Sequence, residues 1–185
     1  MPLPQERTYT IEDIYALPEG TRAELIDGKI YYMAPPTATH QRILNYLNTE
    51  INLYIRNNNG ECEVFPAPFA VHLFKDDEKY LEPDISVICE RNKINDKGCY
   101  GAPDWVIEIV SPASRQMDYG TKQALYLAAG VKEYWIVDPM RKNVMVYCAS
   151  EDWVPTLYRF TDKIRVGIYD DLEIDFTEME KSIKM

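Results

Sequence analysis

The sequence predicts a mixed α/β (α+β) fold in which helices flank a central mixed β-sheet, with an additional antiparallel strand extension. Helical and strand-like segments alternate along most of the chain, which is typical of this class. Residues 105–137 have the strand–helix–strand length of a βαβ unit, so the two strands should be parallel. Shorter apolar segments separated by turns follow from residue 143 onward and predict the extension.

A short helix and a hairpin are expected first. Thr10 is followed three residues later by Asp13, a pattern that caps a helix, here one that ends near residues 18–20. Residues 23–33 hold Asp27-Gly28 between two apolar-rich arms, and such a pair is a strong signal for a tight β-hairpin.

A long helix should follow, capped by Thr37 or Thr39 and running to about Arg56. Its apolar residues recur at helical spacing, and residues 57–60 stop it with asparagines and a glycine. The stripe consists of Ile43, Leu44, Leu47, Ile51 and Ile55. The next strands are expected at 61–65, 69–74 and 85–89, with a charged loop at 75–79 and an irregular connection at 90–103.

The most apolar strand, residues 104–110, should be followed by a second long helix. Ser114 can cap this helix, which is expected from about Arg115 to Ala129 and closes at Gly130. Residues 133–139 then predict another buried strand, ended by proline. The later strands are expected at 143–148, 154–160 and 164–168, before a tail with one helical turn.

Length and composition exclude several classes of protein. With 185 residues and 46% hydrophobic residues, the chain fits one globular domain. It lacks an apolar run of the roughly 18 residues needed for a membrane span, and residues 1–10 lack an apolar signal core, so we expect a cytoplasmic protein. The formal net charge of −10 argues against strong nonspecific binding to nucleic acid. It leaves room for a nuclease whose acidic residues hold Mg²⁺.

Glu108 needs an explanation because it lies in the middle of the most apolar strand. A buried carboxylate is costly unless it is paired, or unless its pKa shifts and it becomes neutral. The structural explanation is a Lys or Arg partner. The functional one is a bound metal ion.

Asp84 could share such an ion with Glu108. It follows Pro83 at the start of a strand, where an aspartate is often structural. However, two carboxylates at adjacent strand positions can bind one divalent cation, and Mg²⁺, or Mn²⁺ as its substitute, takes few oxygen ligands from protein. We therefore expect Asp84, Glu108 and the backbone carbonyl of Ile109 as metal ligands.

A cation for catalysis would have to come from the helix that follows. The strand position two residues after Glu108 is Val110, whereas the helix supplies Lys122, with Tyr126 one turn later on the same face. The alternative is that Lys122 merely pairs with Asp118, four residues earlier, on a solvated face.

These residues together resemble the Uma-type family of restriction endonucleases, in the PD-(D/E)XK nuclease superfamily. The resemblance implies a restriction-endonuclease-like core, about residues 10–160, in a single domain of residues 1–185. It also implies that the catalytic lysine has migrated from the strand to the helix, which Lys122 matches, and that Glu24 completes the metal shell or positions a water. The matching segments are Glu24–Gly28, Pro83-Asp84, Ala102–Pro112, Asp118 with Lys122 and Tyr126, and Gly130–Pro139.

Other polar and aromatic residues are weighed one by one. His40 opens the long helix, where it can contact a phosphate of the substrate or serve as a surface or capping residue, and Tyr126 is a second candidate for substrate contact. His72 and Asp138 are interpreted as structural. The Tyr31-Tyr32 pair and Trp135 are expected to pack in the core and on the sheet.

The four cysteines contain no close pair, which disfavours a zinc knuckle. Cys89 and Cys148 lie in apolar segments, where a free cysteine acts as a small hydrophobic residue.

Three functions remain. The first is a Mg²⁺-dependent endonuclease on DNA, with catalytic residues Asp84, Glu108, Lys122 and Glu24, expected as a homodimer because it would cut two strands. The second is a catalytically inactive binding or assembly module that kept the fold, which the acidic charge and the missing strand lysine favour. The third, a glycosidase using two carboxylates, leaves Lys122 unexplained.

Overall fold

The computed structural model describes residues 7–76 and 78–183 and has a six-stranded central sheet in the order β11-β10-β9-β8-β5-β3. Strands β8 and β9 are parallel and the other neighbours are antiparallel, which confirms the mixed sheet and the βαβ unit. The strands are β3 (Glu63–Pro66), β5 (Ile85–Ile88), β8 (Trp105–Ile109), β9 (Glu133–Asp138), β10 (Asn143–Cys148) and β11 (Thr156–Arg159).

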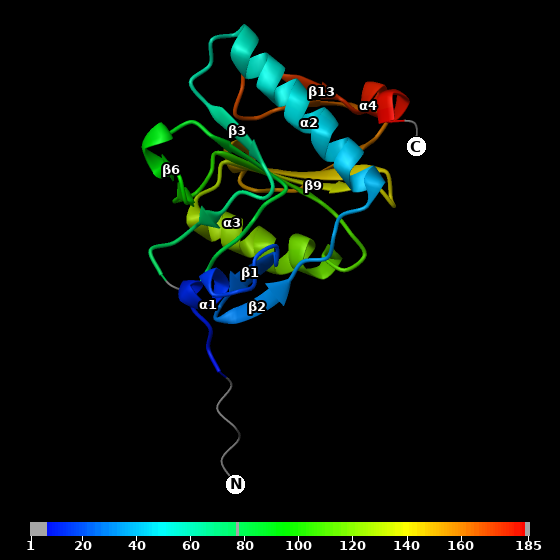
Figure 1. Cartoon of the computed structure of the whole chain (residues 1–185). Helices are drawn as coiled ribbons and strands as arrows, with labels where there is room; N and C mark the ends of the chain where they lie inside the picture. The colour runs from blue at the N-terminus through cyan, green and yellow to red at the C-terminus, as the bar shows by residue number, and fades with distance from the viewer. Residues whose placement is uncertain (1–6, 77, 184–185) are drawn as a thin grey trace.

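Helices cover both faces of this sheet (Figure 1). They are α2 (Ala38–Asn57) and α4 (Phe176–Ile183) on one face, and η2 (Met117–Lys122) and α3 (Gln123–Ala129) on the other. Trp105 and Ile107 of β8 pack on the α2 side, whereas Val106 packs on the α3 side. Because side chains alternate along a strand, Glu108 faces η2 and α3.

The caps and the hairpin form as expected. Thr10 and Asp13 make a capping box for α1 (Ile11–Tyr15), and Thr37, not Thr39, caps α2. The hairpin strands β1 (Ala23–Ile26) and β2 (Lys29–Tyr32) pair with Ile26 opposite Lys29. Between them Asp27 and Gly28 have φ of +48° and +71°, as a tight hairpin turn requires.

The helix after β8 is not regular. Helical turns run from Arg115 to Ala129 as predicted, and Gly130 ends them with φ of +86°. Residues 117–122, however, form a π-helix, which the sequence pattern did not indicate. The Ser114 hydroxyl accepts a hydrogen bond from the Ser111 N–H, so it stabilises the turn before the helix.

The segment 90–103 was expected to be irregular, and this prediction is wrong. It contains η1 (Arg91–Lys93), a short helix, and two strands, β6 (Ile94–Asn95) and β7 (Gly98–Tyr100). The two strands form a three-stranded sheet with β4 (Val71–His72). Local pattern could not show this, because β7 depends on a close approach of two distant backbones. A Cβ at Gly98 would lie 2.4 Å from the Ala70 carbonyl oxygen.

The carboxyl-terminal part extends the fold. Strands β10 and β11 join the main sheet, while β12 (Lys163–Arg165) pairs with β13 (Glu173–Asp175), which the sequence did not predict. The expected helical turn in the tail is α4. Within the described ranges no helix combines the length and apolar composition needed to cross a membrane. Residues 1–6, part of the segment expected to lack a signal core, lie outside those ranges.

Cys89 is not a free cysteine, contrary to the expectation. It forms a disulfide with Cys62, 27 residues earlier in the sequence. The antiparallel pairing of β3 with β5 puts Glu63 opposite Ile88 and so brings the two flanking cysteines together. Cys148 is free and buried, as predicted.

Candidate functional site

Two neighbouring strands bring Asp84 and Glu108 to the same place in the sheet. β5 and β8 pair with Ile85 opposite Ile107, so the same register continued by one residue puts Asp84 opposite Glu108. Directly opposite residues point to the same face. The Ile109 N–H donates a hydrogen bond to Asp84 Oδ2 over 2.8 Å, which holds the Asp84 carboxylate against β8.

Lys122 lies inside this cluster. Its side chain is 5% exposed, and its Nζ is 2.9 Å from Glu24 Oε1 and 3.0 Å from Glu108 Oε1. The Oδ1 atom of Asp118 is farther away, at 3.8 Å. The alternative in which Lys122 pairs with Asp118 on a solvated face is therefore wrong, because this face of η2 packs against β8 and the hairpin.

Glu24 comes from the hairpin strand β1 and is buried. Its Oε1 atom accepts a hydrogen bond from the Glu82 N–H over 3.0 Å, in addition to its contact with Lys122. The Glu82 side chain in turn pairs with Arg22 over 2.8 Å. The hairpin is thus attached to the site by charged side chains from three separate parts of the chain.

The site carries excess negative charge. The carboxylates of Glu24, Asp84, Glu108 and Asp118 and the ammonium of Lys122 line one pocket, so their formal charges sum to −3. Burial raises the pKa of Glu108, against the opposing effect of Lys122. Burial likewise raises the pKa of Asp118 to about 6. An environment that makes carboxylates bind protons also favours a bound cation.

Lys122 keeps its proton in this environment. Burial by itself would lower its pKa, but the carboxylates of Glu108, Glu24 and Asp118 outweigh burial and hold the pKa well above its usual range. Lys122 is therefore an ammonium ion at neutral pH, a group that stabilises negative charge and cannot take up a proton.

Tyr126 is fully buried, so its expected contact with substrate is wrong. Its hydroxyl donates to Glu108 Oε1 over 2.7 Å and helps to orient that carboxylate. His40 does reach the site, where its Nε2 lies 3.1 Å from Asp84 Oδ2. Its backbone N–H bonds to the Thr37 cap, so the start of α2 fixes the position of the ring.

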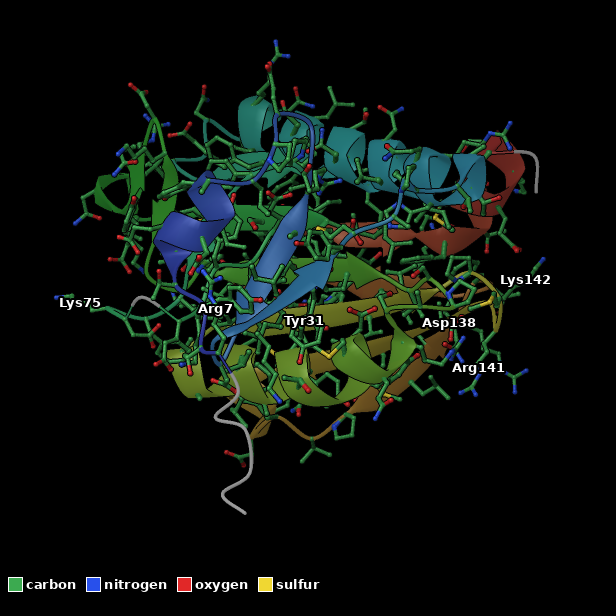
Figure 2. All side chains as sticks on the ribbon, turned by 60° about the horizontal axis from the view of Figure 1, so that its bottom comes forward. Arg7, Tyr31, Lys75, Asp138, Arg141 and Lys142 are labelled. Carbon is green, nitrogen blue, oxygen red and sulfur yellow. A yellow bond between two sulfur atoms is a disulfide. The ribbon has the colours of Figure 1, made fainter. Side chains whose placement is uncertain are left out.

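A pocket of about 580 Å³ opens in front of these residues. Tyr31 and Tyr32 line it and are 39% and 68% exposed, so the expectation that they pack in the core is wrong. The hairpin register explains this position, because Tyr31 lies opposite Glu24 and shares its face. That signal was present in the sequence, since the two-residue turn sets the register. In Figure 2 Tyr31 lies on the hairpin, next to the helical segment that η2 and α3 form.

The donor set fits a hard divalent cation such as Mg²⁺ or Mn²⁺. The pocket offers carboxylate oxygens, and both oxygens of Asp118 are buried without a hydrogen-bond partner among the described residues. Within the same residues no three His, Cys, Asp or Glu side chains converge to hold an ion. Mg²⁺ needs no such cage, because it keeps several waters and binds through one or two carboxylates.

The residues interpreted as structural lie outside this cluster. His72 is buried, stacks on Tyr100, and has its pKa lowered by burial. Trp135 packs against Trp105 in the core. Asp138 accepts a hydrogen bond from the Met140 N–H in the turn, and it also pairs with Arg115 over 2.6 Å, a contact the sequence did not reveal.

Comparisons of the sequence with known proteins identify a family and two relatives. The Uma2 family, described as "Putative restriction endonuclease", matches residues 11–176. The uncharacterized protein slr1290 of Synechocystis sp. is 25% identical over 146 residues, 77% of this chain and 75% of that protein. The uncharacterized protein sll1609 of Synechocystis sp. is 25% identical over 140 residues, which cover 73% of this chain and 77% of that protein.

A solved structure extends the comparison to the fold. It is the crystal structure of "a putative nuclease belonging to DUF820 from Anabaena variabilis ATCC 29413". The TM-score is 0.77 at 23% identity, and the match covers 94% of this chain and 98% of that one. The predicted nuclease-like core is thereby confirmed as a fold.

Proposed function

The chain belongs to the Uma2 family, and on that basis we propose that it is a metal-dependent endonuclease that hydrolyses phosphodiester bonds in DNA. The observation that carries the proposal is Lys122, buried between Glu24 and Glu108 in the pocket that Asp84 also lines. The proposal includes a cytoplasmic location and a homodimer.

Asp84 and Glu108 would hold the divalent ion, Mg²⁺ or Mn²⁺, with the carbonyl of Ile109 as a third protein ligand. The β5–β8 register, continued by two residues, puts Pro83 opposite Ile109. Proline has no N–H, so Pro83 cannot donate a hydrogen bond to the Ile109 carbonyl oxygen, which leaves that oxygen free of this strand neighbour. A bound divalent ion supplies Lewis acidity and lowers the pKa of a water molecule.

The other residues would act on charge and position. Lys122, held as an ammonium, would stabilise the negative charge that develops on the phosphate in the transition state. Glu24 would keep Lys122 in place and accept a hydrogen bond from a water molecule. His40 would hold the Asp84 carboxylate in its orientation toward β8.

A second candidate is a catalytically inactive binding or assembly module with the same fold. The direct contact between Lys122 and Glu108 favours it, because that ion pair can account for the buried carboxylate without any metal. Metal binding and cleavage distinguish the two.

Metal binding is tested by thermal unfolding. Mg²⁺ or Mn²⁺ at millimolar concentration is expected to raise the melting temperature of the wild-type protein, because the ion offsets the excess negative charge of the pocket. Glu108→Gln should abolish this rise, while Lys122 keeps Glu24 as its partner. A full metal response in Glu108→Gln would move the ion to another site.

Cleavage is tested with plasmid, single-stranded and branched DNA. The wild-type protein is expected to nick or cut at least one of these with Mg²⁺ or Mn²⁺ and none of them with EDTA. Protein that binds metal and cuts no substrate would favour the inactive module.

A further inference from the structure

An exposed aromatic side chain lies beside the charged cluster. Tyr31 is 39% exposed, lines the pocket, and shares the face of the hairpin on which Glu24 contacts Lys122. When a tyrosine ring packs in a core, usually only its hydroxyl end contacts water. A ring left open to a pocket offers a flat surface on which a nucleic acid base can stack.

The pocket has the size and lining for such a base. At about 580 Å³ it falls in the range that takes a small-molecule-sized group. Apolar side chains make up about half of the residues that line this pocket, and polar and charged side chains make up the rest. The apolar part of the lining includes Met33, Pro35, Leu44, Met117 and Met140.

A second pocket with two arginines adjoins the first. Its volume is about 570 Å³, and it is lined by Arg115, Tyr119 and Arg141, together with Pro112 and Ala113, which also line the first pocket. Asp138 pairs with Arg115 over 2.6 Å and is 4.0 Å from Arg141, so the group keeps one positive charge. Figure 2 shows Asp138 and Arg141 on the same side of the molecule as Tyr31.

The overall charge of the chain disfavours a long duplex as ligand. A duplex is held mainly through its phosphates, and an acidic protein with a net charge of −10 has few groups for that purpose. Stacking does not depend on charge, but it requires a base that is not already stacked in a helix.

We propose that the two adjoining pockets bind an unpaired strand of nucleic acid, with a base on Tyr31 and a neighbouring phosphate at Arg115 and Arg141. This inference rests on the proposed function for the class of ligand and adds the form of the substrate: single strands, flaps or unpaired ends. The strand enters the pocket as an unstacked nucleotide, and its backbone leaves past the arginines.

The test measures binding by fluorescence anisotropy with Ca²⁺ in place of Mg²⁺. The probes are a labelled 12-nucleotide DNA strand, the same sequence as RNA, and the blunt DNA duplex. The single strands are expected to bind the wild-type protein at least about 10-fold more tightly than the duplex. Duplex binding as tight as that of the single strands would overturn the proposal, and the RNA arm distinguishes the two sources of strand.

Two substitutions test the named contacts. Tyr31→Ala should weaken single-strand binding roughly 10-fold, whereas Tyr31→Phe, which keeps the ring, should not. Arg141→Ala should reduce the slope of log affinity against log salt concentration by about 0.7, because one phosphate contact is lost. An unchanged affinity in Tyr31→Ala, or an equal loss in Tyr31→Phe, would contradict the stacking contact.

The chain offers matched controls for both. Tyr15→Ala removes another exposed tyrosine, 54% exposed on α1. Arg91→Ala removes an arginine that is 64% exposed, against 65% for Arg141. Neither Tyr15 nor Arg91 lines the two pockets, so both variants should bind like the wild type. Strand binding without cleavage would refute the proposed function alone, and cleavage of a duplex bound as tightly as single strands would refute this inference alone.

Discussion

Asp84→Ala and Glu108→Ala are each expected to remove nearly all DNA cleavage by the wild-type protein with Mg²⁺. Both residues are the anionic oxygen ligands that the ion needs, and the register of β5 and β8 sets them opposite one another. Lys122→Ala should slow cleavage by roughly 100-fold or more while leaving part of the metal binding, because it removes one preorganised charge. Lys122→Arg should rescue cleavage only partly, since a planar guanidinium does not fit a contact built for an ammonium.

The measurement is the initial rate of plasmid and single-strand cleavage, at a temperature where circular dichroism shows each variant folded. Glu133→Gln is the matched control. Glu133 is fully buried in the adjacent strand β9, but it bonds to Trp135 and Ile168 outside the pocket. The Glu133→Gln variant should therefore cleave DNA at the wild-type rate. Equal cleavage by the wild type and Glu108→Ala would show that the activity came from a contaminant.

Lys122→Met is expected to lower the free energy of unfolding by roughly 3–5 kcal/mol at pH 8, the largest effect on stability that we predict. The methionine keeps the length of the side chain but removes its charge. Glu24, Glu108 and Asp118 then face one another in a buried pocket without their cation. Urea unfolding gives the free energy, and a variant as stable as the wild type at pH 8 would show that the ion pairs contribute nothing.

The loss in Lys122→Met should shrink as the pH falls. Burial raises the pKa of Glu108 and Asp118 in the folded protein, so each group binds its proton more tightly folded than unfolded. Such a group favours folding below its unfolded pKa, and that contribution is lost as the pH rises through the folded value. For Asp118 in the wild-type protein this window runs from about pH 4 to about pH 6. Lys122 lowers the pKa of both carboxyl groups, so its removal raises these pKa values further, and the loss in Lys122→Met shrinks as the pH falls toward about 6.

Two further variants distinguish the effect of the carboxylates on stability from the effect of Lys122. Asp118→Asn removes one of the titrating groups, so its stability relative to the wild type should rise between pH 4 and pH 6, and the variant should be the more stable protein at pH 8. Lys122→Met with Glu108→Gln removes one stranded anion and should recover part of the loss. A stability difference between Asp118→Asn and the wild type that stays constant from pH 4 to pH 6 would contradict the raised pKa.

Much of the architecture is readable from local pattern. The stripe from Ile43 to Ile55 encodes α2, and Asp27-Gly28 encodes the hairpin. The apolar run before Pro112 encodes β8, and strand alternation then assigns Glu108 to the face that η2 and α3 cover. These signals are local, because helix and strand periods and turn dihedrals depend on residues a few positions apart.

The role of Lys122 was not decided by spacing. An i,i+4 pair with Asp118 is compatible with a solvated face, and only packing of the helix on β8 and the hairpin puts the ammonium between Glu24 and Glu108. The same holds for Tyr126, whose position on the helix gives no sign that its hydroxyl is buried on Glu108.

The sequence by itself determined most of the helices and strands, the parallel β8–β9 pair and the residue types of the site, but not β6, β7, β13 or the π-helix. Tertiary structure alone decided which of these residues meet: Glu24 with Lys122 across 98 positions, and Cys62 with Cys89. The physical reason is that such contacts depend on how whole elements pack, which reflects the total burial of apolar surface and the pairing of buried charges over the entire chain.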